Sequence, residues 1–408
     1  MTYRLKNKNV VLGVCGGIAA YKIVELLRLL TKQGAAVRVF MTRSARQFVG
    51  WMTFQALSGV PVCSDLFEQG DEASFKHIDW AAEADIVVVA PATANIIGKM
   101  ANGIADDALS TFMTVVRSPV IVCPSMNANM FQHPAVQRNI KTLVGDGAVI
   151  VEPNAGDLAC GTEGPGRLPE PAEILDRIVA CLTPKDLQDR RVLVTAGPTR
   201  EPIDPVRFIS NPSTGKMGYA VARAAEHRGA SVTLVAGPSE LPVPANVSLI
   251  QVTTAAEMAR AVLKCAETSE IVIKTAAVSD YRPTSVADQK LKKGEDLTSL
   301  QLEKTDDILK QLGSNKQGRV LVGFAAETQD LDQNAQQKLT EKNLDIIAGN
   351  LIGNPASGFA SDTNRVTLFF RDGTKEVVPE MEKDAVAHIL LNRIVERLLP
   401  ADGQAAGQ

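Results

Sequence analysis

Short apolar runs alternate with stretches of helical spacing along the first half of the chain. Ile18–Leu30 repeats its apolar residues at the intervals of an amphipathic helix. The apolar runs are continuous rather than alternating with polar residues, as strands buried on both faces of a parallel sheet require. They occur at Val10–Val14, Ala36–Met41, Ala84–Ala90, Pro119–Cys123 and Ala148–Val151. This rhythm predicts an α/β domain with a doubly wound, mostly parallel sheet.

The same rhythm stops and restarts near the middle of the chain. Residues 181–190, CLTPKDLQDR, lose periodicity and gain charge, which indicates a domain boundary. Beyond it we expect a helix from Gly215 to His227, a hairpin around Asp372-Gly373 and a final helix over 383–398. The expected parallel strands are Val192–Thr195, Ser231–Ala236, Glu270–Thr275, Arg319–Phe324 and Asp345–Gly349.

Length and composition agree with this division. The 408 residues are too many for one ordinary core. We predict two consecutive doubly wound, Rossmann-like domains, residues 1–182 and 190–400, followed by a frayed tail at 401–408.

A net charge of −3 gives no electrostatic case for nucleic acid or a membrane surface, so small molecules or protein chains are the expected partners. No apolar stretch of roughly 18 residues and no signal-peptide pattern occur, so we expect a cytoplasmic protein.

Small and polar residues follow every apolar run of the first domain, where ligands bind to an open parallel sheet. A lone Gly-Gly pair is more often an ordinary turn than a binding loop. VCGGIAA lacks the GxGxxG pattern, and no acidic residue ends the second strand to hold a ribose. These residues disfavour a dinucleotide and favour a mononucleotide whose single phosphate meets a helix N-terminus. The candidate cofactor residues are Gly16, Gly17, Ile18, Ala19, Ser44, Thr93, Asn95 and Met126.

Several uncommon motifs of this half occur together and in one order. PSMNANM resembles the PxMNxxMW segment of the flavin-dependent cysteine decarboxylases, with Phe131 where that family has Trp. LACGTEGPGRLPEP resembles their substrate-clamp segment, and GGIAAYK and PATANIIGKMANGIADDALST resemble their flavin-binding loops. The resemblance implies a flavodoxin-like domain that binds FMN and decarboxylates a cysteine conjugate.

The resemblance also implies roles for three residues. Hydride transfer from CH2–SH to flavin gives CO2 loss an electron sink, and returning the hydride requires a proton donor. His77 would be the base, although an isolated His is more often an ordinary core or surface residue. Asn127 would hold the substrate carboxylate, and Cys160, in a Gly-rich segment, would protonate the ene-thiol. The six cysteines show no CxxC spacing, and we expect the other five to be structural free thiols.

The second half carries a second set of motifs. TAGPTREPIDPVRFISNPSTGKMG resembles the opening of the phosphopantothenate–cysteine ligases, as do KTAAVSDYRP, GFAAET, KLTEKNLDIIAGN and SDTNRVTL further on. Pro212, Thr214 and Ser279 depart from the usual pattern. The resemblance implies that CTP, with Mg2+, activates a carboxylate as an acyl-cytidylate, which the cysteine amine then attacks.

Roles in the ligase half follow from the same resemblance. Asn211 would bind the acyl-cytidylate, and Lys290, with Lys292 and Lys293, would supply positive charge, although a lysine run is usually a solvated face. Asp280 would contact the ribose or the metal. Lys338 and Lys342 lie four residues apart on one helix face. The expected substrate and nucleotide residues are Ala277, Asp280, Lys290, Asp306, Asp307, Ile308, Phe324, Lys338 and Lys342.

The two resemblances in this order describe the bacterial bifunctional coenzyme A biosynthesis enzymes. The implied small-molecule partners are 4′-phosphopantothenate, L-cysteine and CTP, and the implied assembly is a homo-oligomer of ligase dimers and decarboxylase trimers that combine into a dodecamer. One alternative is a non-catalytic regulatory flavoprotein, against which the presence of both His77 and Cys160 argues. An NAD(P)-dependent reductase is a second alternative, but neither domain opens with GxGxxG.

Overall fold

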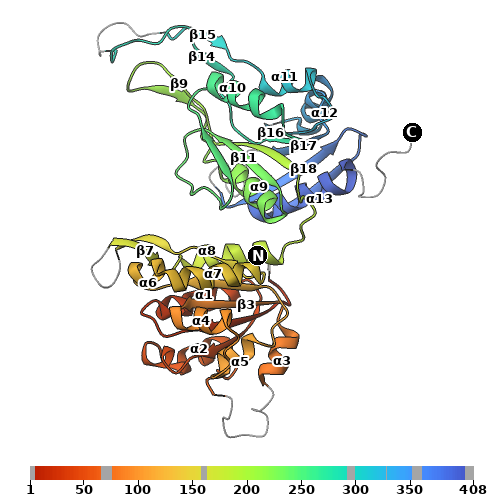
Figure 1. Ribbon diagram of the computed structural model, residues 1–408. Coiled ribbons are helices and arrows are strands. Elements are labelled where there is room, and N and C mark those ends of the chain that lie inside the picture. Colours follow the sequence, from red (N-terminus) through yellow and green to blue (C-terminus); the bar gives the residue numbers. More distant parts are fainter. Residues whose placement is uncertain are drawn as a thin grey trace. The chain divides into compact units, whose positions relative to one another are not determined.

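The computed structural model describes residues 5–65, 76–157, 163–291, 299–327, 329–351 and 361–399. These residues form two compact units, one within 3–183 and the other within 184–408 (Figure 1). No helix in the described ranges is both long and apolar enough to span a membrane.

The N-terminal unit is built on a five-stranded parallel sheet in the order β2-β1-β3-β4-β5. This is the flavodoxin-like strand order, in which the topology switches direction between β1 and β3. The predicted fold class is confirmed here. The strands are β1 (Asn9–Val14), β2 (Ala36–Met41), β3 (Ile86–Ala92), β4 (Val120–Pro124) and β5 (Val149–Ile150).

Helices cover both faces of this sheet because its strands are apolar on both sides. Helices α1 and α8 pack on one face, where Ile23 and Ile178 meet Leu12. On the other face, Ile97 of α4 and Ile140 of α7 lie in the cluster that contains Val87. The helices are α1 (Ala20–Lys32), α2 (Trp51–Ser58), α3 (Lys76–Glu83), α4 (Ala94–Ala101), α5 (Ala108–Met113), α6 (Ala128–Gln132), α7 (Pro134–Gly145) and α8 (Pro171–Leu182).

Several boundaries in this unit differ from the sequence expectation by one or two residues. Strand β3 continues past the expected Ala90, through a cis Ala90–Pro91 bond, to Ala92. Strand β5 is shorter than the expected run 148–151, since only Val149 and Ile150 pair with β4. A hairpin of β6 (Asn154–Asp157) and β7 (Glu163–Arg167) follows, which the apolar pattern does not reveal.

The C-terminal unit has an eight-stranded sheet in the order β12-β11-β8-β13-β16-β17-β18-β19. Its first six strands are parallel and follow the Rossmann order 3-2-1-4-5-6, with the switch point between β8 and β13. The last two strands are antiparallel and form the predicted hairpin. The strands are β8 (Arg191–Ala196), β11 (Ser231–Ala236), β12 (Ser248–Gln251), β13 (Ile271–Lys274), β16 (Val320–Glu327), β17 (Ile346–Leu351), β18 (Thr363–Phe370) and β19 (Lys375–Glu382).

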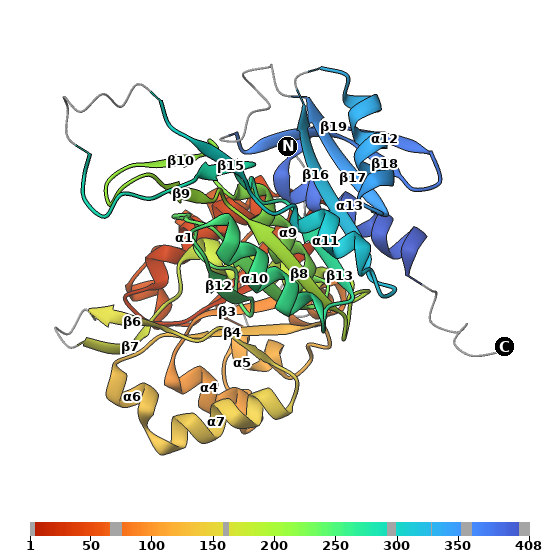
Figure 2. The ribbon, with the colours of Figure 1, turned by 90° about the horizontal axis from the view of Figure 1, so that it is seen from above.

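Helices again cover both faces. Helices α9 and α13 pack together on one face, and α10, α11 and α12 contribute to the core of the other. Two short hairpins, β9–β10 and β14–β15, contact each other through β9 and β14 and project from the same end of the sheet (Figure 2). The elements are α9 (Lys216–His227), α10 (Ala255–Ala266), α11 (Ile308–Ser314), α12 (Leu331–Glu341), α13 (Lys383–Leu398), β9 (Arg200–Pro202), β10 (Phe208–Ser210), β14 (Tyr281–Pro283) and β15 (Leu302–Lys304).

A buried arginine joins three segments of the C-terminal unit. The Arg228 side chain is 4% exposed and forms a two-pronged ion pair with Asp186, in which Nε lies 2.7 Å from Oδ1. Its Nη1 donates to the Asn392 carboxamide oxygen at 2.7 Å and to the His388 carbonyl at 3.2 Å. The residue therefore ties the end of α9 to α13 and to the start of the unit.

We predict that Arg228→Met destabilises the C-terminal unit by about 2–3 kcal/mol, because a carboxylate and two further oxygens lose a charged donor. Pulse proteolysis in urea, read by mass spectrometry, gives the unfolding midpoint of each unit. Arg282→Met is the control: its ion pair with Glu303 is half-exposed on both sides, so its loss should cost less than about 0.5 kcal/mol. Equal shifts for the two variants would contradict the prediction.

Candidate functional sites

The loops after β1 and β2 meet the end of β3 at one edge of the N-terminal sheet. Gly16 follows β1 and lies so close to Ser44, after β2, that a Cβ on Gly16 would be 2.4 Å from the Ser44 Cβ. A Cβ on the next residue, Gly17, would be 3.9 Å from the ring of Pro91. The edge is therefore the switch point of the sheet, where a ligand is expected.

Helix α1 presents its N-terminus at this edge. Its N-cap is Ala19, which makes no side-chain cap bond, and Ile18 before it is 62% exposed. The N–H groups of an uncapped first turn favour an anion, so Gly16–Ala19 fit the phosphate of a mononucleotide. Next to it, Thr93 caps α4 by accepting a hydrogen bond from the Ile96 N–H at 3.4 Å, and Asn95 lies exposed in the first turn of that helix.

The end of β4 is fixed to its neighbours through the backbone. The Ser125 N–H donates to the Ala92 carbonyl, and the Met126 N–H donates to the Gly166 carbonyl of β7, each at 3.0 Å. A Cβ on Gly166 would lie 2.0 Å from the Met126 oxygen, so this approach requires glycine. Met126 and Asn127, the residue that caps α6, are thus held against the β6–β7 hairpin.

The described structure does not place two predicted residues, Cys160 and His77, at this site. Cys160 lies outside the described residues. His77, the second residue of α3, is half-buried, and this helix begins directly after residues that are also outside them. Their catalytic roles remain predictions. Of the other cysteines, Cys15, Cys63 and Cys123 are buried, and burial raises the pKa of the Cys15 thiol to about 12.

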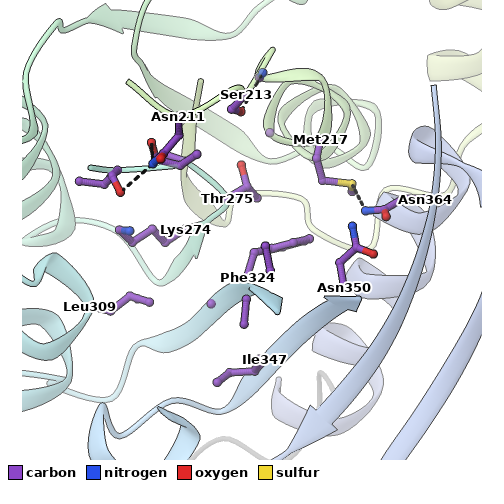
Figure 3. Close-up of a pocket in the computed structure, with 18 of the residues that line it drawn as sticks. Asn211, Ser213, Met217, Lys274, Thr275, Leu309, Phe324, Ile347, Asn350 and Asn364 are labelled. Carbon is purple, nitrogen blue, oxygen red and sulfur yellow. Dashed lines mark hydrogen bonds between the residues drawn. The ribbon is translucent and has the colours of Figure 1, made fainter. Parts of the chain in front are cut away.

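A cavity of about 390 Å3 opens at the carboxyl edge of the C-terminal sheet (Figure 3). It spans the switch point, between the start of α9, which follows β8, and the loop that follows β13. The ends of β16 and β17 and one face of α12 complete it. Six residues expected from the sequence line this one cavity: Asn211, Ala277, Asp280, Phe324, Lys338 and Lys342.

The Asn211 side chain links the β8–α9 connection to the loop after β13. Its side-chain amide donates to the carbonyls of Ala277 and Val278, each at 3.2 Å (Figure 3). The segment that carries Pro212 and Thr214 is tied to the loop after β11, since the Ser239 hydroxyl donates to the Thr214 carbonyl at 3.1 Å. Gly215, at a φ of 82°, then starts α9 in a backbone conformation that favours glycine.

Carboxylates hold Lys338 of α12 and Lys342, the residue that follows this helix. The Lys338 ammonium lies 2.6 Å from Glu327, and that of Lys342 lies 2.8 Å from Asp307, the N-cap of α11. Burial acts to raise the pKa of Asp307, but the hydrogen bonds from Lys342 and from the Lys310 N–H lower it more, so its pKa falls below the ordinary value. The two ion pairs fix the ammonium groups at the cavity wall.

Four expected nucleotide residues are not among those that line the cavity. Lys290, Asp306 and Asp307 are exposed, and Ile308 is buried in the core under α11. The Lys290 segment is tied elsewhere, because the Leu291 N–H donates to the Asp204 carboxylate at 3.3 Å. Lys292 and Lys293 lie outside the described residues, so the expected charge of this segment at the site stays a prediction.

The cavity also contains residues that the sequence reasoning did not select. A lysine ends the apolar run of β13 and opens the motif KTAAVSDYRP, which is the signal that could have identified Lys274. The remaining ones become neighbours only through the fold, because they come from α9, β17, β18, α13 and the connections next to β13 and α9. The unselected polar lining residues are Ser213, Lys216, Lys274, Thr275, Asn350, Asn364 and Lys383.

We predict that Gly218→Ala impairs this cavity. A Cβ there would lie 2.5 Å from both the Ala196 Cβ and the Thr275 hydroxyl oxygen, so α9 must move away from the sheet. Titration with CTP, the nucleotide that the sequence resemblance implies, should show about tenfold weaker binding, a cost of about 1.4 kcal/mol. Gly145→Ala, whose added Cβ meets no atom within 4 Å, is the control. Unchanged affinity in Gly218→Ala would contradict the prediction.

Comparison with known proteins assigns each unit to a family model. Residues 1–183 match the flavoprotein family, and residues 187–398 match the DNA/pantothenate metabolism flavoprotein C-terminal domain. The coenzyme A biosynthesis bifunctional protein CoaBC of Bacillus subtilis is 50% identical over 96% of this chain and 97% of its own. The protein of the same name from Escherichia coli K12 is 46% identical over 96% and 98%.

Among solved structures, a crystal structure of the C-terminal domain of a CoaBC protein is 43% identical, with a TM-score of 0.46, and covers 52% of this chain and 98% of that one. The two full-length relatives match nearly the whole chain, and the two family models match its two units in the same order. The chain belongs to the family of bifunctional coenzyme A biosynthesis proteins, with a flavoprotein domain followed by the pantothenate metabolism C-terminal domain.

Proposed function

We propose that the chain catalyses two consecutive steps of coenzyme A biosynthesis. The C-terminal cavity condenses 4′-phosphopantothenate with cysteine at the expense of CTP, and the N-terminal site decarboxylates the product to 4′-phosphopantetheine. The observation that carries the ligase step is the convergence of Asn211, Asp280, Phe324, Lys338 and Lys342 on one cavity. No observation favours the alternative of a non-catalytic flavoprotein.

The ligase cavity offers the groups that carboxylate activation requires. A carboxylate and an ammonium do not condense in water, so the carboxylate first attacks the α-phosphate of CTP and pyrophosphate leaves. Lys338 and Lys342 would neutralise charge on the nucleotide, while the Asn211 amide would orient the acyl-cytidylate. The cysteine amine then displaces CMP to form the amide.

Asp280 fits a role in binding Mg2+ together with the nucleotide. The described residues include no group of three or more His, Cys, Asp or Glu that could hold a metal alone. Mg2+ in nucleotide enzymes is commonly held by one or two carboxylates plus substrate phosphates. The exposed Asp280 carboxylate at the cavity wall provides one such ligand.

The N-terminal edge fits FMN. Gly16, Gly17, Ile18 and Ala19 would hold its phosphate at the uncapped start of α1, and Ser44, Thr93, Asn95 and Met126 would surround the rest. Bound FMN supplies a hydride acceptor, which lets the cysteine carboxylate leave as CO2. Asn127 would hold that carboxylate, His77 would act as the base, and Cys160 would donate the proton to the ene-thiol.

Two further properties are proposed from the family resemblance. The protein is expected in the cytoplasm. It is expected to assemble through ligase dimers and decarboxylase trimers, which combine into a dodecamer.

Full-length protein incubated with 4′-phosphopantothenate, cysteine, CTP and Mg2+ should form 4′-phosphopantetheine, CMP, pyrophosphate and CO2, as detected by mass spectrometry. Omitting CTP should abolish both amide formation and CO2 release. Accumulation of 4′-phosphopantothenoylcysteine would contradict the decarboxylase step. Absence of any CTP-dependent product would contradict the ligase step.

Two variants should separate the activities within one chain. Gly16→Ala should lose bound flavin, because its Cβ would overlap Ser44 2.4 Å away, and should then stall at 4′-phosphopantothenoylcysteine. Asn211→Ala should retain the flavin and decarboxylate supplied 4′-phosphopantothenoylcysteine, while ligation falls about a hundredfold or more with the loss of an oriented donor. Flavin absorbance and the two product yields test this.

Gly145→Ala, a substitution in open space within the N-terminal unit, is the control for the flavin measurement. Normal flavin content in Gly16→Ala would remove the assignment of this loop to the cofactor. Normal ligation by Asn211→Ala would remove the assignment of Asn211.

A further inference from the structure

The C-terminal cavity is rich in lysine. Lys216, Lys274, Lys338, Lys342 and Lys383 all line it. These ammonium groups come from α9, from α12 and the residue that follows it, from α13, and from the end of strand β13 next to the switch point. The distribution of their partners indicates which of them is available to a ligand.

Four of the five already bond to protein oxygens. Lys338 and Lys342 pair with Glu327 and Asp307, as described above. Lys216 lies 2.7 Å from the Asp362 carboxylate, and the buried Lys383 donates to the Ser361 carbonyl. An anionic ligand must compete with these oxygens for each of the four ammonium groups.

Lys274 differs from them. It makes no hydrogen bond or ion pair with any residue in the described part of the chain, although it is the last residue of a central strand and partly buried. Figure 3 shows its side chain between Asn211 and Leu309, on the wall shared by the Asn211 amide and α11. Burial, and then repulsion from Lys342, lower its pKa to about 8, while Asp307 and Asp280 act in the opposite direction. The free energy gained on binding an anion is larger for an enclosed ammonium without a counter-ion than for an exposed or already paired ammonium.

We infer that Lys274 is an additional substrate-binding residue of the ligase site, whose ammonium binds a phosphate oxygen of the nucleotide. The inference rests on the proposed ligase function and extends it to a residue that the family motifs did not select. Phosphate is the chemistry that an unpaired ammonium recognises here, and both CTP and 4′-phosphopantothenate carry it. The nucleotide is the expected source, because Phe324, Lys338 and Lys342, which the sequence resemblance assigns to it, line the same cavity.

The position of Lys274 also suggests why the contact matters for catalysis. The residue stands three positions before Ala277, whose carbonyl fixes the Asn211 amide. A phosphate held by Lys274 would therefore lie beside the group proposed to orient the acyl-cytidylate. Its charge would stabilise the negative oxygens that develop as the carboxylate attacks and pyrophosphate leaves.

Calorimetric titration of the full-length protein with CTP and Mg2+ tests the inference. Lys274→Met, which keeps the length of the side chain but removes its charge, should raise the Kd for CTP about ten- to a hundredfold. Lys274→Arg should restore most of the affinity. Lys310→Met is the matched control, because it removes an exposed lysine of α11 that does not line the cavity, and should change the Kd less than about twofold. Thermal unfolding of each variant shows that the fold is retained.

A parallel titration with 4′-phosphopantothenate separates the two sources of phosphate. Weaker binding of CTP alone supports the inference as stated, whereas weaker binding of 4′-phosphopantothenate alone overturns the assignment to the nucleotide. In steady-state assays the KM for CTP should rise while the KM for cysteine stays unchanged. Equal rises in both would overturn a specific nucleotide contact and indicate a structural role.

Covalent labelling gives an independent readout without a mutation. Low concentrations of acetic anhydride near pH 7.5 should acetylate Lys274, since a lysine of lowered pKa carries more of the reactive neutral amine. Saturating CTP should suppress acetylation at Lys274 but not at Lys310. Equal acetylation of Lys274 with and without CTP, or a wild-type Kd that Lys274→Met retains, overturns the inference alone. Failure of the wild-type protein to bind CTP overturns the ligase proposal together with it.

Discussion

The parallel pairing of β8 with β13 is the constraint on which the ligase half of this protein depends. Ile271 to Lys274 pair with Val192 to Thr195, so both strands end at the same edge of the sheet. Their connections then leave in opposite directions, which opens a crevice that helices cannot cover. Gly218 lets α9 approach this edge, and the Asn211 amide bridges the crevice to Ala277 and Val278. The arrangement of the backbone creates the cavity before any catalytic side chain is added.

The two units use the same principle with connections of different length. In the N-terminal unit, only residues 15–19 separate β1 from α1, so backbone N–H groups and glycines form the edge. That geometry suits a phosphate held close to the main chain. In the C-terminal unit, residues 197–215 separate β8 from α9 and include the β9–β10 hairpin. A connection of that length can bring side chains such as Asn211 to several substrates, as a condensation between them requires.

The sequence predicts the sheet strands well because burial on both faces leaves a continuous apolar run. The same reasoning explains what it misses. Strand β12, SLIQ, lies at an exposed edge and lacks such a run, and the short hairpins β9–β10 and β14–β15 bury little on either face. Strand β3 continues through Pro91 to Ala92, with an irregular register against β4 between Val89 and Ala92, which no periodicity indicates.

The same limits apply to the sites. Motif resemblance predicts the residues that the fold brings to the ligase cavity, such as Asn211, Phe324 and Lys342. It does not predict which other residues line the same cavity. In the sequence, Lys274 is only the polar end of a strand, and Lys290 is an expected cavity residue. In the structure, Lys274 lines the cavity and Lys290 does not. The residues next to a lysine in the sequence do not determine whether it lines the cavity, because the cavity is formed by strands and helices far apart in the chain.

The pairing of the lysines explains how one cavity can hold several positive charges. Lys338 and Lys342 would repel each other and Lys274 if left alone, but Glu327 and Asp307 offset that repulsion and fix the first two in place. Such pairs hold positive charges in place at the cavity wall. Their carboxylates, however, compete with the ligand for hydrogen bonds from the same ammonium groups. Lys274 lacks that competition, and its desolvation has already occurred on folding. A polyanion can therefore gain its strongest single contact from the lysine that the protein leaves without a partner in the described structure.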